Sequence, residues 1–144
     1  MKFYIILLIL CGLSSFNITA NELNLKPFTS DGCSSFPDGT IEHNELWLHC
    51  CRAHDVDYWQ GGTKAQRLAS DQRLRACVTK VGQPTIAALM LVGVRVGGTP
   101  YLPTSYRWGY GWPYPRFYNK LSESELKLVK HALLSSNLSS NIIE

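Results

Sequence analysis

The sequence has little excess of charge of either sign and no long hydrophobic run. Its 144 residues include 14 Lys and Arg against 11 Asp and Glu. This balance is too even to indicate binding to the phosphate backbone of a nucleic acid. The apolar stretch at residues 3–13 is too short to span a bilayer comfortably. The sequence also lacks an internal repeat, so its length favours a single domain.

The N-terminal stretch has the pattern of a secretory signal. Lys2 supplies the short basic start, an apolar run follows, and Ala20 is the small residue at the cut. We expect residues 1–20 to be removed, residues 21–135 to form the domain, and residues 136–144 to be a flexible tail. The protein would then be secreted or periplasmic. The alternative is that the stretch is retained as an interfacial anchor.

Removal of the signal would leave few cysteines, and an even number of them. Cys11 would be lost, and Cys33, Cys50, Cys51 and Cys77 would remain. In an exported chain, four cysteines indicate two disulfides. Of the three pairings, the one that joins the adjacent Cys50 and Cys51 is strained. Each of the other two would tie the central helix to sequence on both of its sides.

Hydrophobic spacing and turn residues predict a mainly α-helical domain. Apolar residues recur at helical spacing over residues 44–60, with Asn44 as the expected N-cap and Gly61-Gly62 as the end. Thr63-Lys64-Ala65-Gln66 matches a capping box and predicts a second helix that ends near residue 82. A link this short indicates that the two helices run antiparallel.

Two further helices are expected, over residues 85–96 and from a capping box at Ser122 to about residue 134. The helix over residues 85–96 is apolar nearly all round, which predicts that it is buried. Between these helices, residues 99–118 alternate aromatic residues with Gly and Pro, a pattern typical of a loop. We expect this loop to be a satellite core that covers the helix over residues 85–96. The alternative is that some of its rings lie at a lipid–water interface.

Residues 50–55, with the sequence Cys-Cys-Arg-Ala-His-Asp, are the most informative stretch of the chain. Residues four apart lie on one face of a helix, so Cys50 lies under His54 and Cys51 lies under Asp55. Crosslinks at both cysteines would fix the next turn, which carries a base beside a carboxylate that can bind a metal. This arrangement indicates a site for hydrolysis.

A carboxylate on the second helix is level with the histidine if Cys50 bonds to Cys77. In an antiparallel pair, His54 then lies about 6 Å and Asp71 about 9 Å from the bridge in the same direction. Asp71 could accept a hydrogen bond from one ring nitrogen of His54. The other nitrogen would be free to take a proton from water.

With that pairing, the remaining bridge Cys33–Cys51 would draw the loop of residues 31–39 over Asp55. The loop offers backbone carbonyls and the carboxylate of Asp38, and oxygen ligands of this kind suit calcium. A histidine oriented by one carboxylate, beside a calcium held by another, is suited to ester hydrolysis. Water is the nucleophile in such a site, and the metal stabilises the oxyanion.

On these residues the chain resembles the secreted phospholipases A2. The helix motif of that family is Cys-Cys-x-x-His-Asp followed shortly by Tyr, and residues 50–58 match it. The resemblance implies that His54 is the general base, that Asp71 orients it, and that Tyr58 supports Asp71. It further implies an all-α fold built on an antiparallel, disulfide-linked helix pair with additional helices.

The resemblance also implies a calcium site and a disulfide pattern. Residues 31–38 resemble the Cys-Ser-Ser-x-Pro-Asp stretch of short microbial members, in which the aspartate after proline binds calcium. The implied ligands are two carboxylates and two backbone carbonyls, those of Asp55, Asp38, Cys33 and Ser35. The six-residue offset from Asp71 to Cys77 is that of the family and supports the pairing Cys50–Cys77, which leaves Cys33–Cys51.

The chain departs from the family at several positions. The Gly-rich calcium loop of the animal enzymes is absent, and Gly61-Gly62-Thr63 stands in place of a β-hairpin. Asp57 stands where many members have a cysteine, and Ser70 stands where the disulfide partner of that cysteine would fall. Both halves of that bridge are therefore missing together, and Asp57 is left without an assigned role.

The expected function is calcium-dependent hydrolysis of a phospholipid acyl ester, by analogy at the sn-2 position, at a phospholipid or membrane surface. The alternative is a non-catalytic lipid-binding or effector protein on the same scaffold. A zinc site of His49, Cys50, Cys51 and His54 is disfavoured, because adjacent cysteines rarely bind one tetrahedral ion. The remaining aromatic and histidine residues of interest are expected to be core or surface residues: Trp47, Trp59, His43, His49 and His131.

Overall fold

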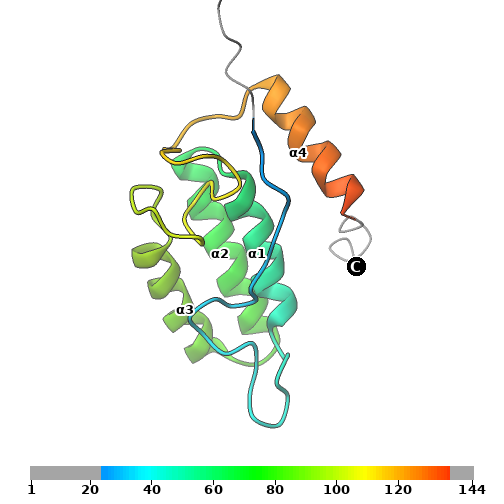
Figure 1. Ribbon diagram of the computed structural model, residues 1–144. Coiled ribbons are helices and arrows are strands. Elements are labelled where there is room, and N and C mark those ends of the chain that lie inside the picture. The colour runs from blue at the N-terminus through cyan, green and yellow to red at the C-terminus, as the bar shows by residue number, and fades with distance from the viewer. Residues whose placement is uncertain (1–23, 137–144) are drawn as a thin grey trace, which may run out of the picture.

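The computed structural model describes residues 24–136. The expected signal, residues 1–20, and residues 137–144 of the expected tail lie outside the described residues. Within the described part the protein is all-helical, and no residue there belongs to a strand. The helices, shown in Figure 1, are α1 (Leu48–Gln60), α2 (Lys64–Lys80), α3 (Pro84–Gly97) and α4 (Glu123–Ser135).

Helices α1 and α2 form an antiparallel hairpin whose tight link is set by local sequence (Figure 1). Gly61 and Gly62 both have positive φ, at 71° and 137°, a region that residues with a Cβ rarely adopt. Thr63 then accepts a hydrogen bond from the Gln66 amide, and the Gln66 side chain accepts one from the Thr63 amide. This capping box starts α2 at once, as predicted.

Helix α1 begins later than the sequence predicts. Its first residue is Leu48, and Trp47 takes the cap position without a side-chain hydrogen bond, whereas Asn44 lies exposed in the preceding turn. The Trp47 side chain is buried, and its Nε1 donates to the carbonyl of Pro37 at 2.6 Å. Tertiary packing of the indole therefore decides where the helix begins and overrides the capping preference of Asn44.

The main core lies between the hairpin and α3. It contains buried residues from each of the three helices, together with Trp47: Cys50, Cys51, Leu74, Val78, Ala87 and Met90. Two disulfides border this core, Cys33–Cys51 and Cys50–Cys77, which are the pairings that the resemblance implied. They indicate folding in an oxidising compartment. They also exclude the disfavoured zinc site, because Cys50 and Cys51 have no free thiolate to bind the ion.

A second, smaller core joins α4 to the end of α1. Its buried members are Trp59, Trp112, Leu121 and Val129. The segment that begins at residue 24 lies between α1 and α4 in Figure 1, and its Leu25 and Phe28 pack into the same core. A capping box at Ser122 starts α4, as predicted.

The aromatic segment of residues 99–118 covers the C-terminal end of α1. Trp108 and Trp112 are buried, as a satellite core requires, and their Nε1 atoms donate to the carbonyls of Gly62 and Gln60, each at 2.8 Å. The segment meets the helix over residues 85–96 only near its end, where Tyr106 lines the same cavity as Val94, and it leaves the outer face of that helix exposed, contrary to the expectation that it covers the helix. The Gln60 carbonyl at the end of α1 and the Gly62 carbonyl in the following link need donors, and the two indoles supply them.

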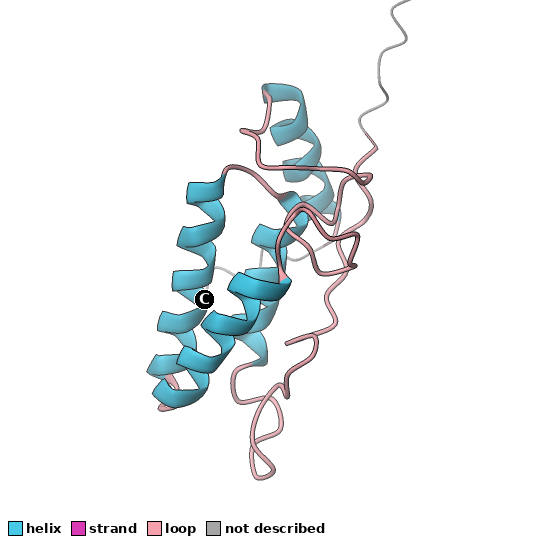
Figure 2. Ribbon diagram, turned by 90° about the vertical axis from the view of Figure 1, so that its left-hand side faces the viewer, coloured by secondary structure: helices cyan, strands magenta, loops and turns pink. Residues whose placement is uncertain are grey.

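Helix α3 is less buried than its sequence predicts. Ala87 and Met90 are its only buried residues, whereas Leu89, Val92 and Val96 are 57%, 60% and 73% exposed. One side of α3 packs on α2, and in the described part of the chain no helix covers the opposite side, as Figure 2 shows. The helix therefore presents an uncovered apolar face. None of the described helices has the length and apolar character needed to cross a bilayer.

Candidate active site

The centre of the site is a hydrogen bond between α1 and α2. His54 Nε2 lies 2.9 Å from Asp71 Oδ1, and both side chains are buried. The Cys50–Cys77 disulfide joins the first turn of α1 to the last turn of α2. The structure thus brings together the imidazole and the carboxylate that the helix spacing places level with each other.

Asp71 accepts hydrogen bonds on both of its oxygens. Tyr58 donates its hydroxyl to Oδ1 at 2.8 Å, and Arg95 donates Nη1 to Oδ2 at 2.6 Å. Burial alone would raise the pKa of Asp71, but the bonds from His54, Arg95 and Tyr58 outweigh it and hold that pKa below its ordinary value. Asp71 is therefore ionised at neutral pH.

The charge on Asp71 decides which nitrogen of His54 can act as a base. An ionised carboxylate only accepts hydrogen bonds, so the nitrogen that faces it, Nε2, must carry a proton. In a neutral imidazole the other nitrogen, Nδ1, then has the free lone pair. Burial and the charge of Asp71 raise the pKa of Tyr58, which keeps its hydroxyl protonated and able to donate.

Two arginines that the sequence analysis did not select complete the network. Arg95 of α3 contacts Asp71 directly, and Arg67 of α2 donates Nε to the Tyr58 oxygen at 3.0 Å. Arg95 carries the only charge in the sequence of α3, and a single charge in an otherwise apolar helix is a signal that could have identified it. Arg67 has no comparable signal, since α2 contains several basic residues.

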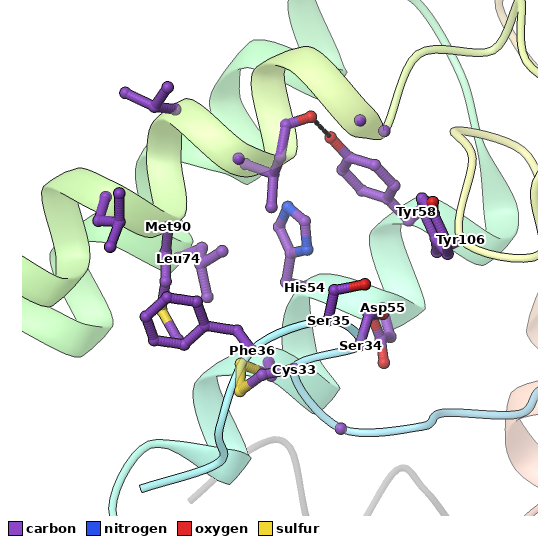
Figure 3. Close-up of a pocket in the computed structure, with 18 residues that line it drawn as sticks. Cys33, Ser34, Ser35, Phe36, His54, Asp55, Tyr58, Leu74, Met90 and Tyr106 are labelled. Carbon is purple, nitrogen blue, oxygen red and sulfur yellow. Dashed lines mark hydrogen bonds between the residues drawn. A yellow bond between two sulfur atoms is a disulfide. The ribbon is translucent and has the colours of Figure 1, made fainter. Parts of the chain in front are cut away.

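His54 lines an apolar cavity of about 440 Å³. Figure 3 shows the ring between α1 and α3, with Tyr58 further along α1 and the loop of residues 32–36 on the other side. Leu89 and Val92 line the cavity and are more than half exposed, so the cavity reaches the uncovered face of α3. The cavity is therefore mainly apolar, with His54 and Asp55 among the few polar residues on its wall.

Asp55 also lines this cavity and lies in a region of negative charge. Its Oδ2 accepts a hydrogen bond from Ser30 at 2.6 Å, a partner that the sequence analysis did not identify. Burial raises the pKa of Asp55 to about 7; the bond from Ser30 opposes this shift, and the charges of Asp31 and Asp38 add to it. A cation bound here would relieve the repulsion between these carboxylates.

The loop that contains Asp38 is folded around its carboxylate. Oδ1 of Asp38 accepts a hydrogen bond from the Cys33 amide at 2.8 Å. Gly32 has a φ of 77°, and a Cβ at this position would overlap the Asp38 carboxylate. The Cys33 carbonyl accepts from the Phe36 amide at 3.2 Å and keeps a second lone pair, while Ser35 lines the cavity. Carboxylate and carbonyl oxygens, the ligands that calcium prefers, are present in this region. Among the described residues, however, no group of three acidic, histidine or cysteine side chains at metal-binding distance includes Asp38 or Asp55.

Asp57 has a structural partner. It accepts a hydrogen bond from Arg73 Nη2 at 2.7 Å, which makes an ion pair between α1 and α2. Ser70 is fully buried, and its hydroxyl has no partner among the described residues. An ion pair at the surface thus links the helices near the position where the resemblance would lead one to expect a third crosslink. His43, His49 and His131 are exposed, as predicted.

Comparison of the chain with models of protein families, with curated proteins and with solved structures gave no match. The chemistry of the site therefore follows from its own geometry. A buried histidine with an ionised partner can accept a proton at Nδ1, and the cavity that it lines can hold an apolar ligand. An oxygen-rich loop lies on the other side of the cavity from α3.

Proposed function

We propose that the protein hydrolyses an acyl ester of a phospholipid, by analogy with secreted phospholipases A2 at the sn-2 position, with His54 as the base that activates water. The observation that carries this proposal is the His54–Asp71 hydrogen bond, at 2.9 Å, on the wall of an apolar cavity. The match of residues 50–58 to the family's helix motif supports it independently of the geometry.

In the proposed reaction, Nδ1 of His54 takes a proton from a water molecule, and the water oxygen adds to the ester carbonyl carbon. Asp71 holds the ring through Nε2 and stabilises the imidazolium that forms. The tetrahedral intermediate then loses the alcohol oxygen of the lipid, which takes the proton back from Nδ1. The products are a fatty acid and a lysophospholipid, and His54 returns to its neutral form.

Calcium would be held by Asp55 and Asp38 together with the backbone carbonyls of Cys33 and Ser35. Bound there, it would supply positive charge for the developing oxyanion. Asp55 must be ionised to bind a cation, and its raised pKa means that the proton and the cation compete near neutral pH. The charges of Asp31 and Asp38 raise this pKa and so favour the proton, and the same charges would also attract a divalent cation.

The substrate would reach the cavity from a lipid surface. Leu89, Val92 and Val96 form the uncovered face of α3, and the first two also line the cavity. This face could enter the interfacial region of a bilayer while an acyl chain passes directly into the cavity. The two disulfides agree with a secreted or periplasmic location, where such a surface is available.

The test is release of fatty acid from phospholipid vesicles, measured with calcium and with a chelator. His54→Ala should abolish release, and His131→Ala, which changes an exposed histidine on α4, should leave it unchanged. Equal release by the wild type and His54→Ala would remove the mechanism. A chelator that has no effect would remove calcium from it.

A non-catalytic lipid-binding protein is the second candidate, and the uncovered apolar face of α3 favours it. Such a protein would bind vesicles without releasing fatty acid. Binding that persists in His54→Ala and in the presence of chelator, with no turnover by the wild type, would select this function instead.

A further inference from the structure

Arg67 is a buried cation with an unusual set of partners. Its side chain is 3% exposed, and no carboxylate pairs with it in the part of the chain described by the structure. Each of its three nitrogen atoms donates a hydrogen bond to neutral oxygen acceptors: the hydroxyls of Tyr58 and Tyr118 and the carbonyls of Val94 and Arg95. A buried guanidinium with a hydrogen bond from every nitrogen holds the hydroxyls and carbonyls that accept those bonds in place.

The bond to Tyr58 sets the direction of that hydroxyl. A guanidinium has donors and no acceptor, so the Tyr58 oxygen must accept from Arg67, and its own proton must point elsewhere. Its two acceptors within reach are Asp71 Oδ1 at 2.8 Å and the Val94 carbonyl at 3.3 Å. The Asp71 contact is the shorter and is charge-assisted, so the hydroxyl donates to the carboxylate.

The bonds to α3 position the second arginine. Arg67 Nη2 lies 2.7 Å from the Val94 carbonyl and 3.0 Å from the Arg95 carbonyl, which are in the last turn of the helix. The Arg95 carbonyl is one of the last four of α3, which have no donor within the helix. The Val94 carbonyl also accepts from the Gly98 amide at 3.1 Å, so Arg67 adds a second donor there. Arg67 therefore fixes the backbone from which Arg95 reaches Asp71 Oδ2 at 2.6 Å.

We propose that Arg67 and Arg95 are positioning residues that act as a pair through Asp71. Arg95 occupies Oδ2 and Arg67 directs Tyr58 onto Oδ1, so the carboxylate is fixed with Oδ1 toward His54. The ring of His54 is thereby held with its Nε2–H directed at the ionised Asp71 carboxylate. The lone pair of Nδ1 is then available to accept a proton. The role in catalysis rests on the proposed function, but the fixed hydrogen bond does not.

The experiment compares Arg95→Met, Arg95→Lys and Arg67→Met with a matched control. Arg73→Met is that control, because Arg73 is an exposed arginine of α2 whose partner is Asp57 rather than Asp71. The first readout is the ¹⁵N-edited NMR signal of the His54 Nε2 proton, assigned by its loss in His54→Ala. The second is the separate measurement of kcat and KM for fatty-acid release.

We expect a protected Nε2 proton in the wild type and in Arg73→Met. The signal should broaden or disappear in Arg95→Met and Arg67→Met and partly return in Arg95→Lys, which restores one donor. In the same two Met variants kcat should fall on the order of 10- to 100-fold with little change in KM, because a misplaced base slows the reaction without altering the cavity. A change in KM with kcat unchanged would contradict a positioning role.

An Arg95→Met protein that keeps both the Nε2 signal and kcat overturns the inference. If Arg67→Met does not fold, as judged by circular dichroism, Arg95→Met decides, because the Arg95 side chain is 30% exposed and easier to replace. A wild type that shows the signal but releases no fatty acid would remove the proposed function. The NMR comparison among the variants would still test the pair.

Discussion

Cys50 and Cys77 join the first turn of α1 to the last turn of α2, with Cα atoms 5.7 Å apart. The hydrogen bond between His54 and Asp71 lies further along the same pair of helices. The disulfide therefore fixes the register on which the contact between the two residues depends. Slippage of one helix past the other by a turn would separate the imidazole from its carboxylate.

Removal of this crosslink should destabilise the protein. For the Cys50→Ala/Cys77→Ala variant we expect a loss of about 3 to 4 kcal/mol in the free energy of unfolding, because the bridge spans 27 residues. Urea unfolding followed by tryptophan fluorescence measures this. The denatured, unreduced chain without residues 1–20 should have no free thiol. Two reactive thiols in the wild type, or an unchanged unfolding midpoint in the variant, would contradict the crosslink.

The pKa of Asp55 should make stability fall as pH rises in the absence of calcium. Burial, with the charges of Asp31 and Asp38, raises this pKa from 3.8 to about 7, so the folded state binds the Asp55 proton more tightly than the unfolded state. Its contribution is full below pH 4 and is lost as the pH rises to about 7. Asp55→Asn should therefore gain stability relative to the wild type between pH 4 and pH 8. A constant difference would show that Asp55 is not perturbed.

Calcium should bind more tightly at pH 8 than at pH 6. Below pH 7 a proton occupies Asp55, and binding must displace it. Isothermal titration calorimetry at the two pH values measures the difference. Asp55→Asn and Asp38→Asn should weaken binding, whereas Asp57→Asn, which removes an acid that pairs with Arg73, should not. Equal affinity in the wild type and Asp55→Asn would place any calcium elsewhere.

The uncovered face of α3 should be needed for action on vesicles. Val96 is 73% exposed and does not line the cavity, so Val96→Asp should weaken vesicle binding without changing hydrolysis of a water-soluble monomeric ester. Leu134→Asp, at an apolar residue of α4 that is 56% exposed, is the matched control and should bind vesicles as the wild type does. Equal loss in both variants would mean that α3 has no special role.

Features that depend on neighbouring residues were predictable from the sequence. The capping boxes at Thr63 and Ser122 start α2 and α4, because the bonds that define them join residues three apart. That His54 and Asp71 lie at the same height along the helix pair was also predictable. It follows from the rise of the α-helix once the Cys50–Cys77 crosslink is assumed. The prediction that Asn44 caps α1 was wrong. The start of the helix depends on the hydrogen bond from the Trp47 indole to the Pro37 carbonyl, ten residues away in the sequence.

Features that depend on what covers an element were not predictable. The apolar sequence of α3 is equally compatible with burial and with an uncovered face, and only the arrangement of the other helices decides between them. Arg95 reaches an acid 24 residues away, and Arg67 contacts Tyr118, 51 residues away. Helical periodicity carries no information about contacts of this kind, so the positive charges next to Asp71 emerged only from the structure.

The hydrogen-bonded groups and much of the cavity wall come from different elements of the fold, which affects how the protein could diversify. His54, Tyr58, Arg67 and Asp71 all belong to the crosslinked α1–α2 hairpin, whereas much of the cavity wall comes from α3 and the loop of residues 32–36. Substitutions in the wall can reshape the space for a ligand while the hydrogen-bonded groups of the hairpin stay in place. The cavity could thus come to admit ligands of another shape while the His54–Asp71 hydrogen bond is kept.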